Sequence, residues 1–203
     1  MILLSELLSA PDFKTAVDDL ARGFREEHEL PPAHQLGLAV PDVETAAAEL
    51  EARGIGPFFI ASGAPALWRE RGQERSFQGK LGMAYYQGLE LELLEPGSGS
   101  DFYRECLDPQ GRIIVQHLGF LVDNVDQWSL RLVTAGIPVW VRGRIKSGPL
   151  TTEFAYMDTM EKTGLVIEFI SWKFLGLRFS PPALIYRALG RFEKLIGKRS
   201  LSL

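Results

Sequence analysis

Hydrophobic and polar positions along this chain follow the same order twice. The stretch QLGLAVPDVETAAAELEARGI, which starts at Gln35, returns as HLGFLVDNVDQWSLRLVTAGI, which starts at His117. Both stretches open with an apolar segment that predicts a strand and continue with apolar residues at three- and four-residue spacing, which predicts a helix. Three further apolar segments follow each helix. In the first copy, a hairpin tip is predicted between two of them, at Tyr85, Tyr86, Gln87 and Gly88. The pattern therefore predicts two copies of a βαβββ module.

We expect an α+β fold built from these two modules. The predicted elements are a strand at 34–40, a helix at 43–53 and strands at 57–61, 81–87 and 89–94 in the first module, and a strand at 116–122, a helix at 125–135 and strands at 138–144, 152–158 and 164–171 in the second. We expect a single domain over 1–203, made of an N-terminal helical extension (1–32), the first module (33–97), a linker helix (98–114), the second module (115–172) and a basic amphipathic C-terminal helix (173–203).

Both ends of the chain carry helical patterns that the modules do not need. Residues 11–27 have one apolar face, and two prolines end this segment before the first module. Near the C-terminus, Ser180 is placed to cap a helix and Pro181 fits its first turn. This helix has one apolar stripe, made of Leu184, Ile185, Ala188, Leu189, Phe192, Leu195 and Ile196. Its basic residues lie largely off this stripe: Arg187, Arg191, Lys194 and Lys198. We expect the stripe to pack on the body or on a second subunit, and we favour this over a membrane-surface role.

Side chains on a strand alternate between two faces, and this alternation decides which residues meet. The helix-facing side is predicted to hold apolar residues: Leu36, Leu38, Val40, Leu91, Leu93, Leu118, Phe120, Val122, Ile167 and Phe169. The opposite, cupped side is predicted to hold polar ones: Gln35, Glu90, Glu92, His117 and Glu168. His34 then faces away from the cupped side, because Gln35 and not His34 aligns with His117.

A carboxylate on the inner face destabilises the fold by several kcal/mol if it is buried, ionised and unpaired, so something must compensate Glu92 and Glu168. A divalent cation would do so, because two carboxylates, one imidazole and one amide oxygen suit Zn, Ni, Co, Fe or Mn. Arginine partners or open water would compensate the same acids. The spacing does not decide between these explanations and a metal.

Composition and charge restrict the class of protein. The chain has 203 residues, of which 46% are hydrophobic and 24% charged, as in ordinary globular proteins. Cys106 is the single cysteine, which excludes an internal disulfide, and the opening residues lack an export signal, so we expect a cytoplasmic protein. Seven Lys/Arg and one Glu give residues 173–203 a charge of +6, which leaves −10 for residues 1–172 because the total is −4. The acidic body argues against a nucleic-acid surface.

Three other groups are weaker candidates. Aromatic residues on predicted strands are candidates to wall an apolar pocket, with sheet core as the alternative: Phe58, Phe59, Tyr86, Phe154 and Tyr156. Residues in a predicted long connection are candidates to hold an anionic group, with a solvated loop as the alternative: Trp68, Arg69, Arg71 and Arg75. The segment GRIKSGPL, near Gly143, is predicted to be a flexible loop over the site.

The residues on the inner face also carry a family resemblance. The motif H-L-G-F-x-V-D-N at His117, the strand that ends L-E-L-L-E-P after Glu90 and the last strand V-I-E-F-I around Glu168 resemble the vicinal oxygen chelate superfamily. This superfamily includes glyoxalase I, methylmalonyl-CoA epimerase, extradiol dioxygenases and antibiotic-binding resistance proteins. The resemblance covers residues 33–172 and implies that the two modules form an open, cupped barrel around a metal.

The resemblance also implies a metal site. It places Gln35, Glu92, His117 and Glu168 on the four ligand positions, a set similar to that of glyoxalase I. A small-molecule substrate with two adjacent oxygens, such as an acyl or α-oxygenated carbonyl compound or a thioester, would bind a divalent cation there. Glu168 and Glu92 would be the catalytic residues that take and return a proton. The implied function is a metal-dependent isomerase, epimerase or lyase, which we expect to be a homodimer without nucleic-acid or membrane partners.

Two other functions stay open. An iron-dependent extradiol dioxygenase would need a second histidine at the centre, and His34 would have to turn inward to supply it. A metal-free protein that binds and sequesters a ligand would keep the fold without the metal. Fold alone does not decide among these functions.

Overall fold

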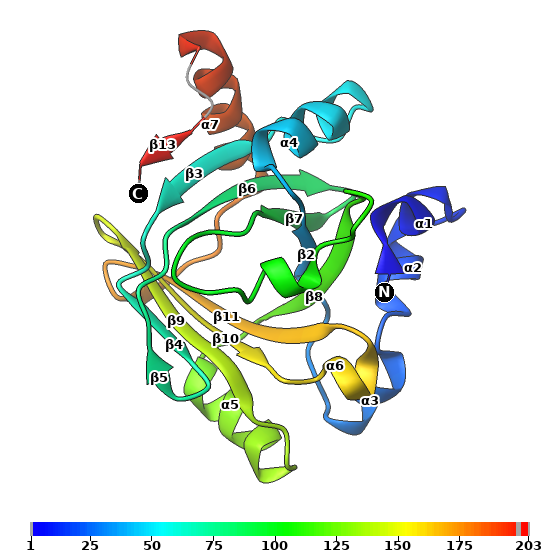
Figure 1. The fold of residues 1–203 in the computed structure, drawn as a ribbon, viewed down its shortest axis with the longest axis vertical. Helices are drawn as coiled ribbons and strands as arrows, with labels where there is room; N and C mark the ends of the chain where they lie inside the picture. The colour runs from blue at the N-terminus through cyan, green and yellow to red at the C-terminus, as the bar shows by residue number, and fades with distance from the viewer. Residues whose placement is uncertain (1, 198–199, 203) are drawn as a thin grey trace.

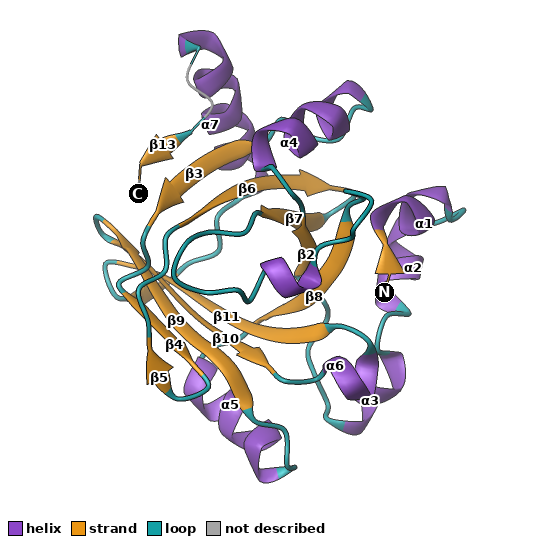
Figure 2. Cartoon of the chain, viewed as in Figure 1, coloured by secondary structure: helices purple, strands orange, loops and turns teal. Residues whose placement is uncertain are grey.

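The structure, a computed structural model, describes residues 2–197 and 200–202. Its strands form one 13-stranded sheet that curls strongly, so that one face is concave and the other convex (Figure 1). The α-helices lie around the outside of the curl, whereas the short helical segment Arg104–Cys106 is drawn within it (Figure 2). The predicted α+β class and the cupped barrel are confirmed.

Both predicted βαβββ modules are present, with element bounds within three residues of the predicted ones. The first module contains β2 (Gln35–Ala39), α4 (Val43–Ala52), β3 (Phe59–Gly63), β6 (Gly79–Tyr86) and β7 (Leu89–Leu94). The second contains β8 (Ile114–Leu121), α5 (Val125–Thr134), β9 (Val139–Ser147), β10 (Leu150–Met157) and β11 (Val166–Phe174). The other elements are β1 (Ile2–Leu3), α1 (Leu4–Ser9), α2 (Phe13–Asp18), α3 (Arg22–Glu27), β4 (Leu67–Glu70), β5 (Gln73–Glu74), the 3₁₀ helix η1 (Arg104–Cys106), α6 (Met160–Thr163), β12 (Leu177–Arg178), α7 (Ala183–Ile196) and β13 (Leu201–Ser202).

The first strands of the two modules, β2 and β8, pair antiparallel at the centre of the sheet. Each also pairs in parallel with the last strand of its own module, β2 with β7 and β8 with β11. The order β3-β6-β7-β2 on one side is therefore mirrored by β8-β11-β10-β9 on the other. This arrangement places β7, β2, β8 and β11 side by side in the middle of the concave face.

The convex face holds the main hydrophobic core, as the alternation predicts. Every apolar residue assigned to this side is at most 2% exposed and belongs to one cluster: Leu36, Leu38, Val40, Leu91, Leu93, Leu118, Phe120, Val122, Ile167 and Phe169. Burying a large apolar side chain contributes about 1.5–3 kcal/mol. A register slip of one residue would turn all of these side chains to the concave face, so the core also fixes which residues face the cavity.

The segment between the modules differs from the predicted linker helix over 98–114. Only the three residues of η1 are helical there. Phe102 and Tyr103 just before η1 are buried, at 1% and 4% exposure, in a second cluster that contains Trp68 and Tyr156. The Tyr103 hydroxyl lies 3.0 Å from the Tyr156 hydroxyl. Burial of these neighbouring aromatic residues overrides the helical pattern of the segment, because helix propensity is a weak preference that tertiary packing outweighs.

The predicted long connection in the first module folds into the β4–β5 hairpin, which pairs with β9 of the second module. Each arginine of this segment faces a carboxylate: Arg69 with Glu74 at 2.7 Å, Arg71 with Asp158 at 3.1 Å and Arg75 with Glu70 at 3.8 Å. These partners balance the arginine charges, which weakens the prediction that the segment holds an anionic group.

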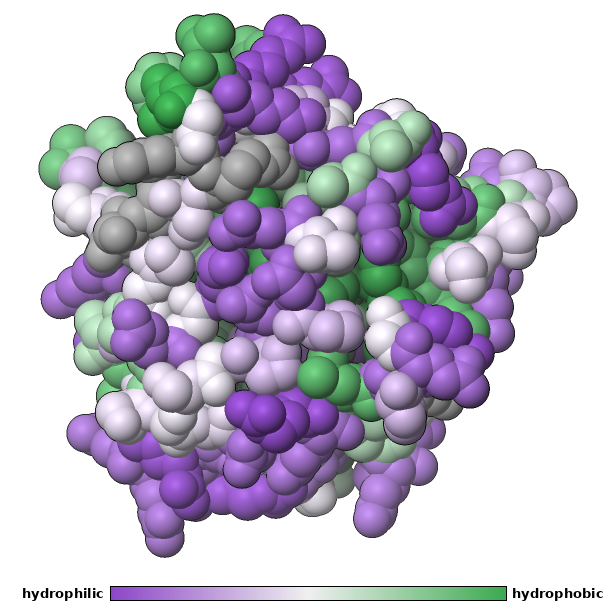
Figure 3. Space-filling view, turned by 45° about the horizontal axis from the view of Figure 1, so that its top comes forward, coloured by the Kyte–Doolittle hydropathy of each residue, from purple (hydrophilic) through white to green (hydrophobic). Residues whose placement is uncertain are grey.

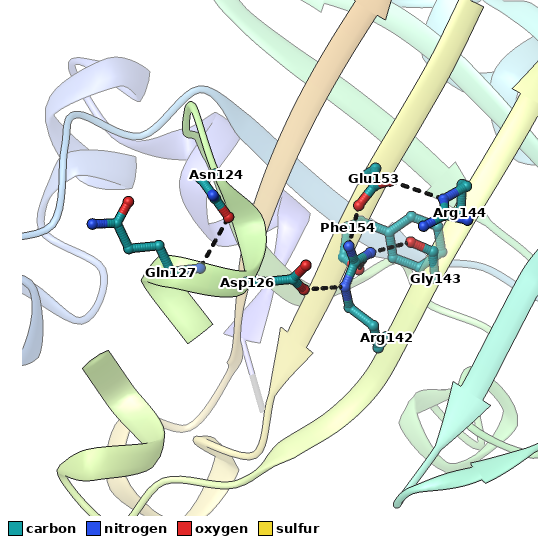
Figure 4. Close-up of polar contacts among 8 residues, drawn as sticks. All are labelled: Asn124, Asp126, Gln127, Arg142, Gly143, Arg144, Glu153 and Phe154. Carbon is teal, nitrogen blue, oxygen red and sulfur yellow. Dashed lines mark hydrogen bonds and ion pairs between the residues drawn. The ribbon is translucent and has the colours of Figure 1, made fainter. Parts of the chain in front are cut away.

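The prediction of a flexible loop near Gly143 is wrong, because this residue lies inside β9. Gly143 pairs with Phe154 of β10 on one side and with Trp68 of β4 on the other. A Cβ atom at Gly143 would lie 2.0 Å from the Phe154 ring. Glycine therefore allows the ring to lie against the strand backbone, and the two residues are adjacent in Figure 4.

Arg142, next to Gly143, ties α5 to the sheet (Figure 4). Its guanidinium donates to Asp126 of α5 at 2.8 Å, to the Phe154 carbonyl at 3.0 Å and also to Glu153. Burial acts to raise the pKa of the Glu153 carboxyl, but its hydrogen bonds with Arg142 and Arg144 lower that pKa on balance. The network holds the outer side of β10 while the next residue, Phe154, faces the cavity.

The helix predicted over 11–27 is divided into two short helices, α2 and α3. Asp12 caps α2 by accepting a hydrogen bond from Thr15 N at 2.7 Å. The chain turns after α2, and Ala21 adopts a left-handed φ of 50° before α3 begins. Arg25 Nη1 donates to the Asp18 carbonyl at 2.7 Å, which satisfies a carbonyl at the end of α2 and stabilises the turn.

The C-terminal helix differs from its prediction in both its start and its orientation. α7 begins at Ala183 after Pro182, without a side-chain cap, so Ser180 and Pro181 precede it. Most of its apolar stripe faces away from the body, since Leu184 and Leu195 are 75% and 84% exposed, whereas Leu189 lines the cavity of the sheet. Packing of the stripe on a second subunit stays a prediction. The predicted basic residue Lys198 lies outside the described residues. No helix among the described residues, α7 included, is long and apolar enough to cross a membrane.

We predict that Gly143→Ala destabilises the fold by about 1–3 kcal/mol, because the new methyl group overlaps the Phe154 ring. The measurement is the free energy of unfolding in urea. Gly23→Ala is the control, since a Cβ added at Gly23 in α3 would have no atom within 4 Å, and it should be neutral or slightly stabilising. Equal stabilities of the two variants would contradict the close packing at Gly143.

Candidate metal centre and cavity

The concave face lines a cavity of about 450 Å³. Most of its walls are apolar, and the large lining side chains are Phe59, Trp68, Phe77, Met83, Phe154, Tyr156, Ile170, Trp172, Phe174 and Phe179. Polar side chains from the central strands also line it, namely Gln35, Glu92 and Glu168. A mostly apolar pocket with a few converging polar groups is typical of a small-molecule site.

The structure brings the four predicted ligand residues together beside this cavity. Gln35 lies on β2, Glu92 on β7, His117 on β8 and Glu168 on β11, which are the four central strands. His117 Nε2 lies 3.0 Å from Glu168 Oε2, 3.2 Å from Gln35 Oε1 and 3.5 Å from Glu92 Oε2. Donor atoms that bind one ion at about 2.1 Å are about 3.0–3.4 Å from their neighbours. The observed distances therefore fit a single divalent cation.

The hydrogen bonds around His117 turn its free lone pair toward the other three side chains. Gln116 Oε1 lies 2.6 Å from His117 Nδ1, so Nδ1–H donates to it and Nε2 is the unprotonated nitrogen. Gln35 Nε2 donates to Glu90 Oε1 at 2.7 Å, which leaves Gln35 Oε1 facing His117. The atoms that converge are thus a nitrogen lone pair, an amide oxygen and carboxylate oxygens. Only a proton or a cation can join such a set of acceptors.

Among the residues that the structure describes, no positive side chain compensates these acids. Within residues 2–197 and 200–202, no lysine or arginine forms an ion pair with Glu90, Glu92 or Glu168. The Glu168 side chain is 4% exposed and that of Glu92 is 12% exposed, so bulk water reaches them poorly. The alternative in which arginines compensate these residues is therefore wrong, and the alternative of open water fails for Glu168.

Burial shifts every titratable group of the cluster toward its neutral form. It raises the pKa of Glu92 to about 8 and raises the pKa of Glu168 well above the ordinary carboxyl value. Burial also lowers the pKa of His117 to about 4, although the nearby Glu92 acts in the opposite direction. The cluster thus lacks positive charge, and its donor set of carboxylates, imidazole and amide oxygen suits a divalent metal.

Two repeated glycines make room for the cluster. A Cβ atom at Gly37 would lie 1.8–2.2 Å from ring atoms of His117, and one at Gly119 would lie 2.9 Å from Gln35 Oε1. Gly37 pairs with His117 across the β2–β8 ladder, and Gly119 pairs with Gln35. In the repeated sequences Q-L-G and H-L-G, the glycine of each module therefore accommodates the polar side chain of the other module.

Two supporting residues were not assigned a role from the sequence. Glu90 is fully buried and orients the Gln35 amide, and burial raises the pKa of Glu90 to about 7. The alternation of side chains along β7 places Glu90 on the same face as Glu92, and this alternation is the sequence pattern that predicts a position for Glu90 beside the cluster. The β2–β8 pairing shifts register at Gln116, and the Gln116 amide oxygen accepts a hydrogen bond from the ring of its neighbour, His117. Nothing in the sequence predicts this bulge.

His34 lies apart from the cluster, as the alternation predicts. Its ring makes an edge contact with Tyr85, with the ring centroids 6.5 Å apart. In the described part of the chain, no contact joins His34 to the four candidate ligands. The cluster therefore has one histidine.

The predicted aromatic wall is confirmed in part. Phe59, Phe154 and Tyr156 line the cavity. Phe58 is fully buried in the convex core, and Tyr86 packs edge-on against Phe13 at 5.2 Å between ring centroids. Phe58 and Tyr86 therefore belong to the hydrophobic core, which is the alternative to a role in the cavity wall.

A family model for the glyoxalase/bleomycin resistance protein/dioxygenase superfamily matches residues 34–156. The chain belongs to this superfamily. The matched segment starts just before Gln35 and includes Glu92 and His117, whereas Glu168 lies beyond it. A search of curated proteins found no match.

Several solved structures resemble this superfamily member at low identity. Methylmalonyl-CoA epimerase from Mycobacterium tuberculosis is 16% identical over 68% of this chain and 85% of the epimerase, with a TM-score of 0.45. A variant of the Streptomyces coelicolor epimerase, in complex with 2-nitronate-propionyl-CoA, is 16% identical over 75% of this chain and 99% of its own, with a TM-score of 0.46. A mutant of 4-hydroxymandelate synthase from Streptomyces coelicolor is 15% identical over 80% of this chain and 54% of its own, with a TM-score of 0.47.

We predict that Gly37→Ala displaces the His117 ring and lowers the free energy of unfolding by about 1–3 kcal/mol, because a rigid ring occupies the space of the new Cβ. Gly119→Ala is the matched variant in the other module, where the two nearest atoms, both at 2.9 Å, are the ends of flexible side chains. It should lower the free energy of unfolding by less than Gly37→Ala does. Urea unfolding measures both. A Gly37→Ala protein as stable as the wild type would contradict the close approach of His117 to β2.

Proposed function

We propose that this protein is a metal-dependent isomerase, epimerase or lyase that moves a proton next to a metal-chelated carbonyl. The observation that carries this proposal is the convergence of Glu92, His117, Glu168 and the Gln35 amide oxygen at an apolar cavity, where no positive side chain among the described residues compensates them. Superfamily membership agrees with it but does not select the reaction.

Gln35, Glu92, His117 and Glu168 would hold the ion. A bound divalent cation supplies a Lewis acid that polarises a carbonyl oxygen and makes the adjacent C–H more acidic. Gln116 would keep the His117 tautomer fixed, and Glu90 would keep the Gln35 amide oxygen pointed inward. Such supporting hydrogen bonds orient ligands and tune their affinity.

Glu92 and Glu168 are the residues we assign to proton transfer. They lie on β7 and β11, on opposite sides of the β2–β8 pair, and both line the cavity. A substrate carbon held between them would have a carboxylate on each of two sides. Glu92 is the more exposed of the two acids, at 12% against 4%, so it is better placed to take and return a proton at the substrate.

The cavity walls favour a substrate with an apolar body. Among the described lining residues, Lys80 is the one with a positive charge, and it is paired with Glu44 at 3.1 Å and Glu95 at 3.7 Å. The arginines of the β4–β5 hairpin are also paired with acids. We therefore infer an acyl or α-oxygenated carbonyl compound with a hydrophobic chain, in preference to a thioester with a polyphosphate tail.

Metal content is the first test. Elemental analysis of protein purified without a chelating column should find about one divalent metal ion per chain. Glu168→Gln and His117→Ala should lose it, because each removes a donor from the cluster. Glu153→Gln is the control, since this carboxylate lies on the outer side of β10 and contacts Arg142 and Arg144.

Retention of the metal in Glu168→Gln and His117→Ala would place the ion elsewhere. Absence of metal from the wild type, together with unchanged ligand affinity in Glu168→Gln, would favour the ligand-sequestering alternative. Oxygen uptake with a catechol would favour the dioxygenase alternative.

Proton transfer is the second test. In D₂O, the wild-type enzyme should exchange the proton next to the carbonyl of a 2-hydroxyketone, as followed by ¹H NMR. The apolar cavity predicts that kcat/KM rises about fourfold for each added methylene until the cavity is full, from about 0.8 kcal/mol per buried methylene. Glu92→Gln should lower the rate at least about 100-fold. Exchange that is independent of chain length would contradict the assigned substrate class.

A further inference from the structure

α7 presents its apolar stripe to solvent. Leu184, Leu195 and Phe192 are 75%, 84% and 51% exposed, and Ile185 and Ile196 are 40% and 44% exposed. We call these five residues the outward stripe. Single exposed apolar residues are ordinary, but five large ones along one face of a helix of 14 residues form a contiguous patch. Such patches on folded proteins mark sites of interaction.

The opposite face of α7 fixes this orientation. Tyr186, Gly190 and Glu193 are the buried residues of the helix. A Cβ at Gly190 would lie 2.6 Å from the Phe58 carbonyl oxygen, so only glycine allows this approach to the strand region. Glu193 is fully buried, and its Oε2 accepts a hydrogen bond from Ile60 N at 3.0 Å. The helix is therefore held by Tyr186, Gly190 and Glu193, while the five residues of the outward stripe face solvent.

Basic residues flank the outward stripe. Arg187, Arg191 and Lys194 lie along one side of it, at positions that are three or four residues apart. Arg187 and Arg191 are exposed and form no ion pair within the described part of the chain, whereas Lys194 pairs with Glu51 at 2.7 Å. Figure 3 shows hydrophobic and hydrophilic atoms side by side at the top of the molecule, where α7 projects. The segment from residue 173 onward has a charge of +6 on a chain whose other residues sum to −10.

The outward stripe continues into the cavity. Ile185 is part of the stripe and also lines the cavity, as does the neighbouring Leu189. On the β11–β12 hairpin, Phe174 and Phe179 line the same cavity, and Leu175 and Leu177 at its tip are 73% and 75% exposed. The hairpin also carries the basic residues Lys173 and Arg178. Exposed apolar and basic residues therefore occur on both elements that border this part of the cavity.

We propose that α7 and the β11–β12 hairpin dock on an anionic membrane surface, with the apolar side of the cavity open toward the lipid. A helix that lies in the membrane interface has an apolar face with cations beside it at the level of the headgroups, which is the pattern of α7. The acidic body would be repelled from the same surface, so the charge distribution orients the molecule. A second copy of the chain would not require the exposed arginines beside the stripe. This inference does not depend on the proposed reaction.

Flotation with lipid vesicles tests the proposal with the full-length wild-type protein. It should bind vesicles of phosphatidylcholine and phosphatidylglycerol and bind phosphatidylcholine alone at least about tenfold less, with loss of binding at high salt. Phe192→Ser with Leu195→Ser should reduce binding at least about tenfold. Arg187→Glu with Arg191→Glu should reduce binding to the anionic vesicles alone, by about fivefold for each charge removed.

Leu130→Ser is the matched control, because Leu130 is 63% exposed on α5, away from this surface, and it should bind as the wild type does. All of these changes are at exposed positions, and circular dichroism checks that each variant is folded. No binding of the wild type to anionic vesicles, or an equal loss in Leu130→Ser, would overturn the proposal. It would also be overturned if sedimentation without lipid showed a wild-type dimer that Phe192→Ser with Leu195→Ser converts to a monomer, since a second copy would then cover the stripe.

Discussion

The candidate site depends on the absence of positive charge at the point where His117 Nε2 meets three oxygen-bearing side chains. The nearest atom of each of these side chains is an oxygen, and the three oxygens lie 3.0–3.5 Å from that nitrogen. Acceptors at this distance repel one another unless a proton or a cation lies among them. Burial prevents water from relieving Glu168, and no lysine or arginine in the described part of the chain does so. The surrounding structure is consistent with a cluster held open for a cation.

The duplicated fold explains how such a cluster persists. The β2–β8 pair brings one polar side chain from each module to the same place, and β7 and β11 each add a carboxylate. The convex core fixes the register of all four strands, so the ligands cannot move without exposing buried apolar residues. Gly37 and Gly119 leave the space that the facing side chains occupy. The same strand register therefore determines both the burial of the apolar core and the positions of the four candidate ligands.

Much of this arrangement was predictable from two regular patterns in the sequence, the alternation of side chains along each strand and the repeat of one module in the other. Alternation along the strands identified the core residues, and the repeat identified Gln35 and His117 as equivalent positions. The register shift that brings Gln116 to His117 has no sequence signal, because a bulge is set by pairing between distant strands. The prediction that the stripe of α7 packs on the body was wrong for a related reason, whereas its packing on a second subunit stays a prediction. The apolar stripe favoured burial, but Gly190 and Glu193 make specific contacts with the region of Phe58 and Ile60, which no helical pattern contains.

The most direct test of the central claim is an anomalous difference map from crystals of the protein grown with Co²⁺ or Zn²⁺, recorded at the absorption edge of the metal. The account predicts one peak at about 2.0–2.3 Å from Gln35 Oε1, His117 Nε2 and an oxygen of each of Glu92 and Glu168. A map without a peak at this position, in which Glu168 and His117 remain in contact as they are here, would show that a proton holds the cluster together and would contradict the metal site.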